Sequence, residues 1–423
     1  MRIVVEPGSY LLENVGDVAM LQVAVRRLRE LWPTADIHVV TEAPQQLPLF
    51  CPGTTPVLGT PTRPDSRPGG VHGLLSRAVW NRIRGKRQRA NERPAVIAAA
   101  MLDADLIVVS GMGGLNDSFA ARAGRLVHTL ERAIENNIPA VLLGQGIGPL
   151  REPRFRERLS RVLTRAGLIA LRERLAGPPL LDQLGVPRDI VRITGDDAIE
   201  MAYEARPAQM GRALGINVRV AHYAGVSDAT VDTLRGVLRD AAARLRAEVL
   251  PVPISHRHGG LDARTNRALL GDLHPASDGG ASLRTPLDVI HQVGRCRLVV
   301  AGSYHAGVFA LAQGIPVVGL VNSPYYADKF RGLADMFGAG CEIVRLDEPA
   351  YAASLAGAID RAWASAESLR PRLLTAAAAQ VESARDAYRD VRTLVDERRL
   401  HGGAPSHPAA AQAGHGWAGR HVD

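Results

Sequence analysis

The chain has 423 residues, of which 46% are hydrophobic, enough for two domains of ordinary size. Only 4% are aromatic, which argues against a groove that binds sugars or bases by stacking. The formal net charge is +8, which favours anionic ligands, but no nucleic-acid-binding motif accompanies it, so we expect no nucleic-acid partner.

The first half of the chain is expected to alternate strands with helices. An amphipathic helix at 14–33 follows the first strand, and another helix is expected at 123–137. This alternation is typical of a parallel sheet with right-handed crossovers. Short apolar runs with polar or glycine-rich exits predict the strands, at 2–8, 36–41, 103–111, 138–150, 167–175 and 189–198.

A second α/β run follows a boundary at 206–212. We therefore predict an α/β protein with two Rossmann-like domains that face each other across a cleft. The first is residues 1–205, and the second is residues 206–400, closed by a long helix from about 352 to 400. The low-complexity tail 401–423 is expected to be disordered.

Two segments of the first half are atypical. Residues 52–71 are rich in Pro and Gly and predict a loop. The segment 73–93 is strongly basic, with three apolar residues on one helical face. Such a helix can lie on a membrane or hold a lipid pyrophosphate, and a solvated surface helix is an equal alternative.

The ends of the chain and its cysteines bear on location. The first residues begin a strand at once, with no signal segment, and no apolar run is long enough to cross a bilayer. Cys51, Cys296 and Cys341 form neither a disulfide framework nor a zinc pattern. We expect a cytoplasmic protein whose contact with a membrane, if it has one, is peripheral.

Polar residues at the predicted strand ends mark candidate ligand contacts, because ligands of parallel sheets bind beyond the carboxyl ends of the strands. The first such end carries Asn14, Gly16 and Asp17. Asp17 as the N-cap of a helix, after a turn at Gly16, is the simpler interpretation. The alternative is a substrate loop in which Asp17 accepts a proton.

Two glycine-rich ends follow. In SGMGGLND (110–117), Gly113, Gly114 and Asn116 belong to a predicted cradle of backbone N–H groups. It has neither the lysine of a P-loop nor the spacing of a dinucleotide fingerprint, so ATP and NAD are poorly supported. In GQGIGP (144–149), Gln145 offers a neutral hydrogen-bonding group to a ligand.

The fourth end, AGSYHAG (301–307), places His305 at the start of a helix. Histidine exchanges protons near neutral pH, but a helix N-terminus disfavours imidazolium unless an anion compensates. An ordinary helix histidine is the alternative; the small residues around His305 favour function. Arg172 after its strand, and Lys329, can bind a carboxylate or phosphate, or form surface ion pairs.

The sequence gives little support for a metal site. His256 and His258 are a possible pair, but no third ligand stands at a suitable spacing. We therefore expect neither a metal nor a cofactor.

The order of these motifs resembles the polysaccharide pyruvyl transferase family. NVGD, SGMGGLND, GQGIGP, LRE, TGDDA, SYHAGVFALAQGIPVVGL and YYADKF follow one another over roughly residues 1–340. The resemblance implies a fold of the GT-B glycosyltransferase type. It also implies transfer of a pyruvyl group from phosphoenolpyruvate to two hydroxyls of a saccharide, as a cyclic ketal.

The resemblance also implies roles for particular residues. His305 matches the family's histidine and Arg172 its upstream arginine. Ser303, Tyr304 and Lys329 then belong to the donor side, with Asp17 as a base toward the acceptor. Phosphoenolpyruvate is a co-substrate, so the scheme includes no cofactor.

One position departs from the family. An arginine usually stands two residues before the histidine, where this chain has Ser303. Loss of a charge-assisted pair would weaken donor binding by about 1.5–3 kcal/mol. Another basic residue then substitutes, or the donor has changed, or activity is lost. Two alternative functions are a GT-B glycosyltransferase that uses a nucleotide sugar and a non-catalytic scaffold. For the acceptor, the basic segment 73–93 favours a lipid-linked saccharide.

Overall fold

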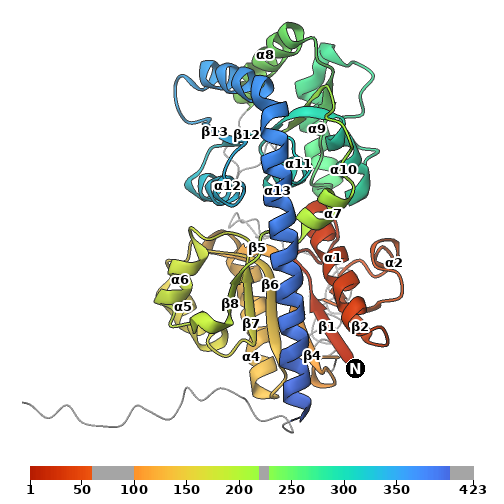
Figure 1. Cartoon of the computed structure of the whole chain (residues 1–423), viewed down its shortest axis with the longest axis vertical. Helices are drawn as coiled ribbons and strands as arrows, with labels where there is room; N and C mark the ends of the chain where they lie inside the picture. Colours follow the sequence, from red (N-terminus) through yellow and green to blue (C-terminus); the bar gives the residue numbers. More distant parts are fainter. Residues whose placement is uncertain (60–99, 219–227, 401–423) are drawn as a thin grey trace, which may run out of the picture.

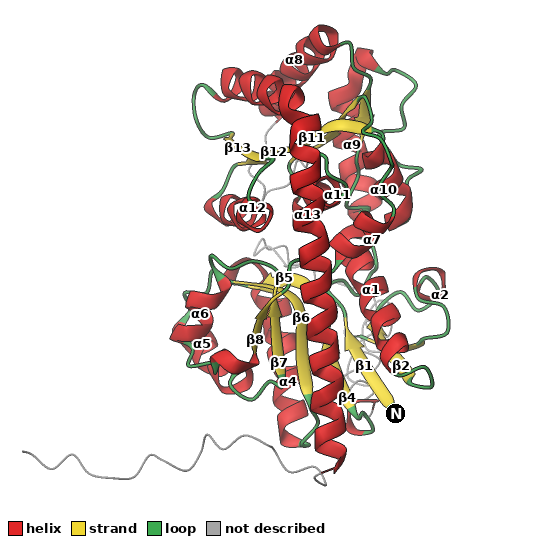
Figure 2. Ribbon diagram, in the orientation of Figure 1, coloured by secondary structure: helices red, strands yellow, loops and turns green. Residues whose placement is uncertain are grey.

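A computed structural model of the protein describes residues 1–59, 100–218 and 228–400, in two α/β domains stacked end to end (Figures 1 and 2). The basic segment 73–93 and the tail 401–423 lie outside the described residues, as does the predicted loop from residue 60 onward. None of the described helices has both the length and the apolar run needed to cross a bilayer.

The N-terminal domain is built on an eight-stranded sheet in which all strand pairs are parallel. Seven strands follow the order β3-β2-β1-β4-β6-β7-β8, and β5 pairs with β6 beside this path. Its strands are β1 (Arg2–Glu6), β2 (Asp36–Thr41), β3 (Thr55–Leu58), β4 (Leu106–Val109), β5 (Met112–Leu115), β6 (Ala140–Ile147), β7 (Leu168–Leu171) and β8 (Val191–Ile193).

Helices cover both faces of this sheet, because successive side chains of its strands point to opposite faces. Ile3 and Val5 of β1 belong to one buried cluster and Val4 to another. The first cluster packs under α1 (Val15–Leu31) and the end of α13 (Tyr351–Leu400), and the second under α4 (Ala120–Glu135), α5 (Pro153–Leu163) and α6 (Gly177–Gln183). The helical segments up to the domain junction are α1 (Val15–Leu31), α2 (Leu47–Phe50), η1 (Asp117–Phe119), α4 (Ala120–Glu135), α5 (Pro153–Leu163), α6 (Gly177–Gln183), η2 (Arg188–Ile190) and α7 (Ala198–Glu204).

Two strands lie where the sequence predicts loops. Part of the predicted loop 52–71 is β3, which pairs with β2. Part of the predicted glycine cradle is β5, and its pairing with β6 is irregular between Met112 and Leu115. The backbone of Gly113 and Gly114 is therefore held beside β6 and does not form an open loop.

The C-terminal domain has a five-stranded parallel sheet of order β10-β9-β11-β12-β13. Its strands are β9 (Ala213–Asn217), β10 (Val249–Pro251), β11 (Cys296–Ala301), β12 (Val317–Val321) and β13 (Cys341–Arg345). Its helical segments are α8 (Asp228–Leu245), α9 (Arg257–Leu270), η4 (Gly271–Leu273), α10 (Pro286–Gly294), α11 (Tyr304–Ala312) and α12 (Pro324–Phe337), and the last helix of the described residues is α13 (Tyr351–Leu400).

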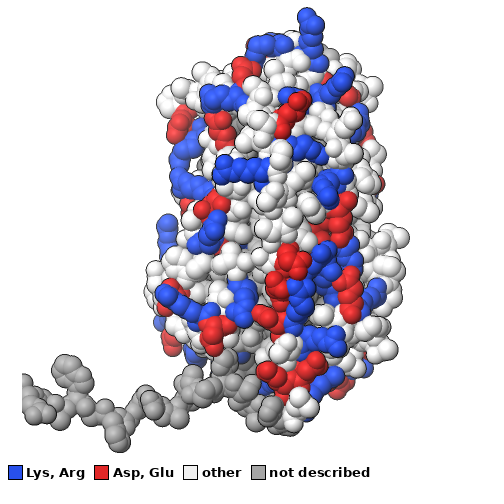
Figure 3. All heavy atoms as spheres, in the orientation of Figure 1, with Lys and Arg blue, Asp and Glu red and all other residues white. Residues whose placement is uncertain are grey.

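Helix α13 belongs to both domains, which corrects the predicted division of the chain. Its start packs in the C-terminal core through Leu355 and Ile359. Its end packs against the N-terminal sheet through Tyr388, Val391 and Val395. Figure 1 shows it running along the whole molecule, and Figure 3 shows mixed acidic and basic side chains along its lower half. The helix therefore fixes the domains relative to each other.

Buried polar contacts join α13 to the domain junction. The hydroxyl of Tyr388 donates a hydrogen bond to Asp197 Oδ2 at 3.2 Å. Beside it, Glu200 is 2% exposed and pairs with Arg26, Arg27 and Arg385. Burial, and then the charge of Asp196, raises the pKa of Asp197 to about 7.

We expect Asp197→Asn to stabilise the protein at alkaline pH. The raised pKa means that folding favours the protonated carboxyl, so its contribution is complete below about pH 4 and lost as the pH rises through 7. Asparagine keeps an acceptor for Tyr388 without the charge. Unfolding at pH 8 should show a gain of up to about 4 kcal/mol over wild type. The gain should shrink toward pH 5; a pH-independent difference would contradict this assignment.

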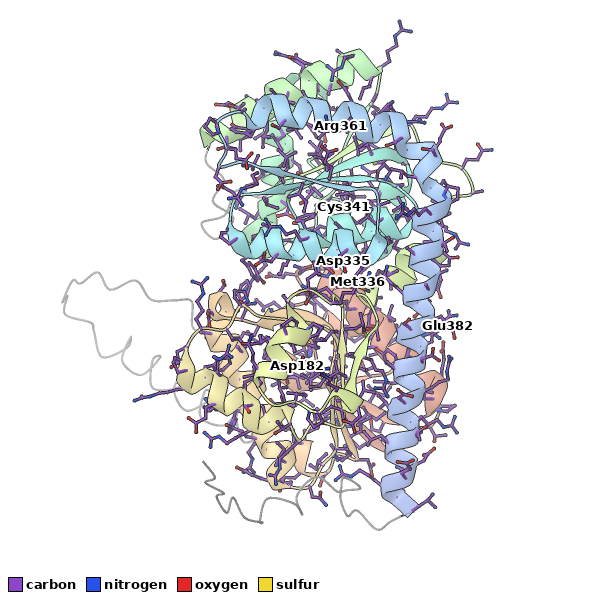
Figure 4. The ribbon with its side chains drawn as sticks, turned by 60° about the vertical axis from the view of Figure 1, so that its left-hand side comes forward. Asp182, Asp335, Met336, Cys341, Arg361 and Glu382 are labelled. Carbon is purple, nitrogen blue, oxygen red and sulfur yellow. The ribbon has the colours of Figure 1, made fainter. Side chains whose placement is uncertain are left out.

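The domains also touch directly near the cleft. The backbone N–H of Val15 donates to Ile254 O at 2.9 Å, and that of His256 to Glu13 O at 2.7 Å. On the other side, Asp335 at the end of α12 faces the N-terminal domain (Figure 4) and accepts hydrogen bonds from Arg174. The carboxyl ends of both sheets therefore meet at one cleft, as ligand-binding α/β domains require.

Candidate active site

Two adjoining cavities lie in the cleft. They share Gly113, Arg172, Tyr304 and Lys329, and each has about 850 Å³ of space including its mouth. The histidine cavity, as we name it, is lined by Ser9, Asn14, Asp17, Gly113, Phe119, Arg122, Arg172, Ile254, Ser255, Arg257, Ser303, Tyr304, His305, Tyr326 and Lys329. The apolar cavity is lined by Gly113, Gly146, Ile147, Gly148, Pro149, Leu150, Arg172, Glu173, Ala176, Pro179, Leu180, Gln183, Tyr304, Tyr325, Asp328 and Lys329.

His305 stands in the first turn of α11, directly after β11. Every residue of this helix is buried, so the imidazole is fixed by its surroundings and is itself 7% exposed. Its Nε2 atom lies 3.6 Å from Asp196 Oδ2, beyond hydrogen-bond distance but close enough for a charge interaction. Asp196 therefore supplies the anion that a protonated histidine needs at the positive end of a helix.

Asp196 also holds Arg172. Its Oδ2 atom accepts a hydrogen bond from Arg172 Nη1 at 3.1 Å, and both side chains are almost fully buried. Burial opposes the charge on Asp196, but His305 and Arg172 hold the pKa of its carboxyl below the usual value. The two residues follow neighbouring strands, β7 and β8, which explains how the fold brings them together.

Close packing fixes the Arg172 guanidinium. Its Cζ lies 4.1 Å from the centre of the Tyr304 ring, a cation–π contact. A Cβ at Gly146 would lie 2.7 Å from Arg172 Nε, and one at Gly113 would lie 2.6 Å from Nη2. Any side chain at either glycine would thus displace the guanidinium. Although burial opposes it, the negative charge of Asp196 raises the pKa of Arg172, which stays charged.

Lys329 completes the cationic group around Gly113. A Cβ at Gly113 would lie 3.0 Å from its Nζ, which also lies 4.2 Å from the centre of the Tyr325 ring. The Tyr325 hydroxyl donates to Gly113 O at 3.0 Å and accepts from Asn116 Nδ2 at 3.2 Å. Burial raises the pKa of Tyr325 to about 12, so the hydroxyl keeps its proton.

The loop before α1 contributes differently from its predicted role. Asn14 is the N-cap, and its Oδ1 accepts from the backbone N–H groups of Gly16 and Asp17. The prediction of Asp17 as the cap is therefore wrong, because the helix begins two residues earlier, at Val15. Asp17 instead lines the histidine cavity, and a Cβ at Gly16 would overlap the His305 ring.

Three predicted contacts lie outside both cavities. Gln145 is completely buried, and its Nε2 donates to the carbonyls of Val109, Ser110 and Leu143, so it braces β6 within the core. Asn116 donates a hydrogen bond to the hydroxyl of Tyr325 and thereby holds its ring in place. Gly114 lies against the side chain of Arg122, with a would-be Cβ 3.2 Å from Arg122 Cδ. Eight of the other predicted residues line the histidine cavity, and Gly16 packs on His305.

The sequence reasoning missed four residues of the site. Asp196 lies in the TGDDA motif, and Tyr325 lies in the YYADKF motif that also supplies Lys329. Arg122 and Arg257 had no motif around them; their only sequence signal is a place in the first turn of a helix that follows a strand end.

Comparison with known families gives a match over residues 14–324 to the model described as "Polysaccharide pyruvyl transferase". The chain belongs to the polysaccharide pyruvyl transferase family. This match confirms the resemblance expected from the motif order, and it identifies the protein as a transferase whose family acts on saccharides. A comparison with curated proteins gives no match.

Solved structures of other enzymes share the fold of this pyruvyl transferase family member. One is a Listeria monocytogenes protein described as a UDP-N-acetylglucosamine 2-epimerase, with 13% identity, 94% of this chain and 97% of that chain covered, and a TM-score of 0.56. Another is UDP-GlcNAc 2-epimerase from Neisseria meningitidis bound to UDP-GlcNAc. It is 11% identical, the match covers 94% of this chain and 100% of that chain, and the TM-score is 0.53. The predicted GT-B-like fold is confirmed.

Proposed function

We propose that the protein transfers the pyruvyl group of phosphoenolpyruvate to two hydroxyls of a saccharide, forming a cyclic ketal and releasing phosphate. The observation that supports this best is that His305, Arg172 and Lys329 line one cavity, with the buried carboxylate of Asp196 beside the first two. It places a proton-exchanging ring next to two cations, which is what the chemistry of an enolpyruvate donor with two anionic groups needs.

His305 is the proposed acid. It donates a proton to the methylene carbon of the donor, which makes C2 electron-poor. The first sugar hydroxyl attacks C2 and passes its proton to Asp17, which lines the same cavity. Phosphate then leaves with the C–O bonding pair, the second hydroxyl closes the ring, and its proton leaves to solvent or phosphate. Arg172 holds one anionic group of the donor throughout.

A nucleotide-sugar glycosyltransferase is the second candidate. The feature that favours it is the start of α11, where the N-cap Ser303 makes no capping hydrogen bond, so the helix N-terminus can face a diphosphate. Nucleoside diphosphate, not phosphate, would be the product.

Product analysis separates these candidates. The full-length protein is incubated with a saccharide acceptor panel and either phosphoenolpyruvate or a UDP-sugar. We expect acceptor-dependent release of inorganic phosphate from phosphoenolpyruvate and a ketal-bearing product that is 70 mass units heavier, by the stoichiometry of the transfer. Release of UDP alone would overturn the proposal in favour of the glycosyltransferase. A thermal-shift screen in which neither donor stabilises the protein would indicate a scaffold.

The family to which the chain belongs implies that the acceptor is a saccharide. We propose a lipid-linked saccharide, met at a membrane surface, because of the basic segment 73–93, which lies outside the described residues. Including lipid-linked and free saccharides in the acceptor panel tests this directly.

A further inference from the structure

The histidine cavity has a second cationic end, apart from Arg172 and Lys329. It consists of Arg122, in the first turn of α4, and Arg257, the first residue of α9. Burial lowers the pKa of Arg122, and the nearby positive charges of Arg125 and, less strongly, Arg257 lower it further. Cations from the two domains thus line one space. Arg257 has a long ion pair with Glu13, at 3.9 Å, and an anion bound in the cavity would offset the remaining repulsion between the two arginines.

The neighbours of Arg122 do not satisfy it. Its Nη2 atom is buried and has no hydrogen-bond partner among the described residues. Asp17 is the strongest opposite charge nearby, yet it forms no direct ion pair with Arg122 in the part of the chain that is described. Glu6 is a poor partner, since burial raises its pKa to about 7 and it already accepts a hydrogen bond from Tyr10.

Other unsatisfied donors line the same cavity. Ser303 Oγ and the hydroxyl of Tyr304 are buried without hydrogen-bond partners among the described residues, and each side chain belongs to a residue that is about 95% buried. Buried polar groups of native proteins are normally satisfied. Several unpartnered donors around one cavity therefore indicate a polar ligand that accepts hydrogen bonds.

Glycines leave room for the side chains of both cationic ends. A Cβ at Gly114 would lie 3.2 Å from Arg122 Cδ, and one at Gly8 would lie 3.4 Å from Arg122 Nη2. The preceding residue, Gly113, clears the space for Arg172 and Lys329 in the same way. Consecutive glycines of β5 thus accommodate separate cationic groups.

We propose that Arg122 and Arg257 form a second anion-binding subsite, so that the cavity takes a small donor with two anionic groups. Arg172 and Lys329 hold one group and Arg122 and Arg257 hold the other, with the reacting carbon against His305. Only the identity of the donor rests on the proposed function. Arg122 then supplies, from the N-terminal domain, the positive charge that the neutral Ser303 does not.

Titration calorimetry on the full-length protein tests the subsite. The probes are phosphoenolpyruvate, pyruvate, inorganic phosphate and UDP, and the variants are Arg122→Gln, Arg257→Gln and Arg172→Gln. We expect Arg122→Gln to weaken phosphoenolpyruvate binding about tenfold or more, and Arg257→Gln about threefold, because Arg257 is half exposed. Arg132→Gln is the matched control, an exposed arginine of α4 that pairs with Glu135, and should change nothing.

Probes with one anionic group sharpen the assignment. One of the two variants, Arg122→Gln or Arg172→Gln, should weaken the binding of pyruvate but not of phosphate. The other variant should weaken the binding of phosphate but not of pyruvate. Arg122→Lys keeps the charge at a buried position and should bind phosphoenolpyruvate with intermediate affinity, which covers the case that Arg122→Gln does not fold. Arg257→Gln serves the same purpose at an exposed position.

The outcomes separate this inference from the proposed function. Binding of UDP but not phosphoenolpyruvate, weakened by Arg122→Gln, would retain the subsite and overturn the donor. Phosphoenolpyruvate turnover with Arg122→Gln affinity within twofold of wild type would retain the function and overturn the subsite. Failure of the wild type to bind any of the four anions would also overturn the subsite.

Discussion

Replacement of His305 by asparagine should lower turnover by a factor of about 10²–10⁴, the range that general acid–base catalysis contributes. Asparagine fills part of the space and keeps a polar group, but it cannot deliver a proton to the donor. The donor-binding cations Arg172 and Lys329 are untouched, so donor affinity should change little. Phosphate release from phosphoenolpyruvate with saturating acceptor measures the rate, and calorimetry measures the affinity.

His128→Asn provides the control for this variant. His128 lies on α4 with its side chain 70% exposed and lines neither cavity, so the same chemical change there should leave turnover at the wild-type rate. Full turnover by His305→Asn would end the assignment of His305. Equal losses of turnover and of donor affinity would mean that the histidine binds the donor without serving as its acid.

Asp196 lies between His305 and Arg172 and affects the position of both side chains. The carboxylate contacts both the imidazole and Arg172, so it orients two groups of the site without lining either cavity. It is a positioning residue by this geometry. Its loss would leave Arg172 buried without its partner, and removing one member of a buried pair costs about 3–5 kcal/mol, so stability must be measured beside activity.

The sequence predicts most of the architecture because the signal is local. Continuous apolar runs such as 106–109 and 140–143 lie in strands buried on both faces, and the period of α1 places its apolar side on the sheet. The short strands β3 and β5 could not be predicted, because the residues of both segments are typical of turns. Each becomes a strand only by pairing with an adjacent strand of the sheet, β2 or β6. The course of α13 over both domains depends likewise on contacts far along the chain.

The site was predictable in its positions more than in its contacts. Strand ends located His305, Arg172 and Asp17 correctly in one cavity. The sequence could not show that the side-chain amide of Gln145 donates to three backbone carbonyls, because those carbonyls belong to two separate segments of the chain. Nor could it show that Arg122 reaches the same cavity, since arginines in helices are most often on the surface.

The contact between Gly16 and His305 leads to the second large expected effect. Gly16→Ala should lower turnover by about 10²-fold, because the new Cβ would overlap the imidazole and push it from the reacting carbon. Donor affinity should fall less, since Arg172 and Lys329 lie elsewhere in the cavity. Crowding of the buried ring should also cost about 1–3 kcal/mol of stability, visible in denaturant unfolding.

Gly124→Ala is the matched control, a helical glycine with nothing within 4 Å of its would-be Cβ. There alanine should leave turnover unchanged and stabilise the protein by about 0.4–1 kcal/mol. Combining Gly16→Ala with His305→Asn completes the argument. If the glycine acts through the imidazole, the double variant should be hardly slower than His305→Asn alone. Additive losses would show that Gly16 matters for another reason and that His305 is not held where the structure places it.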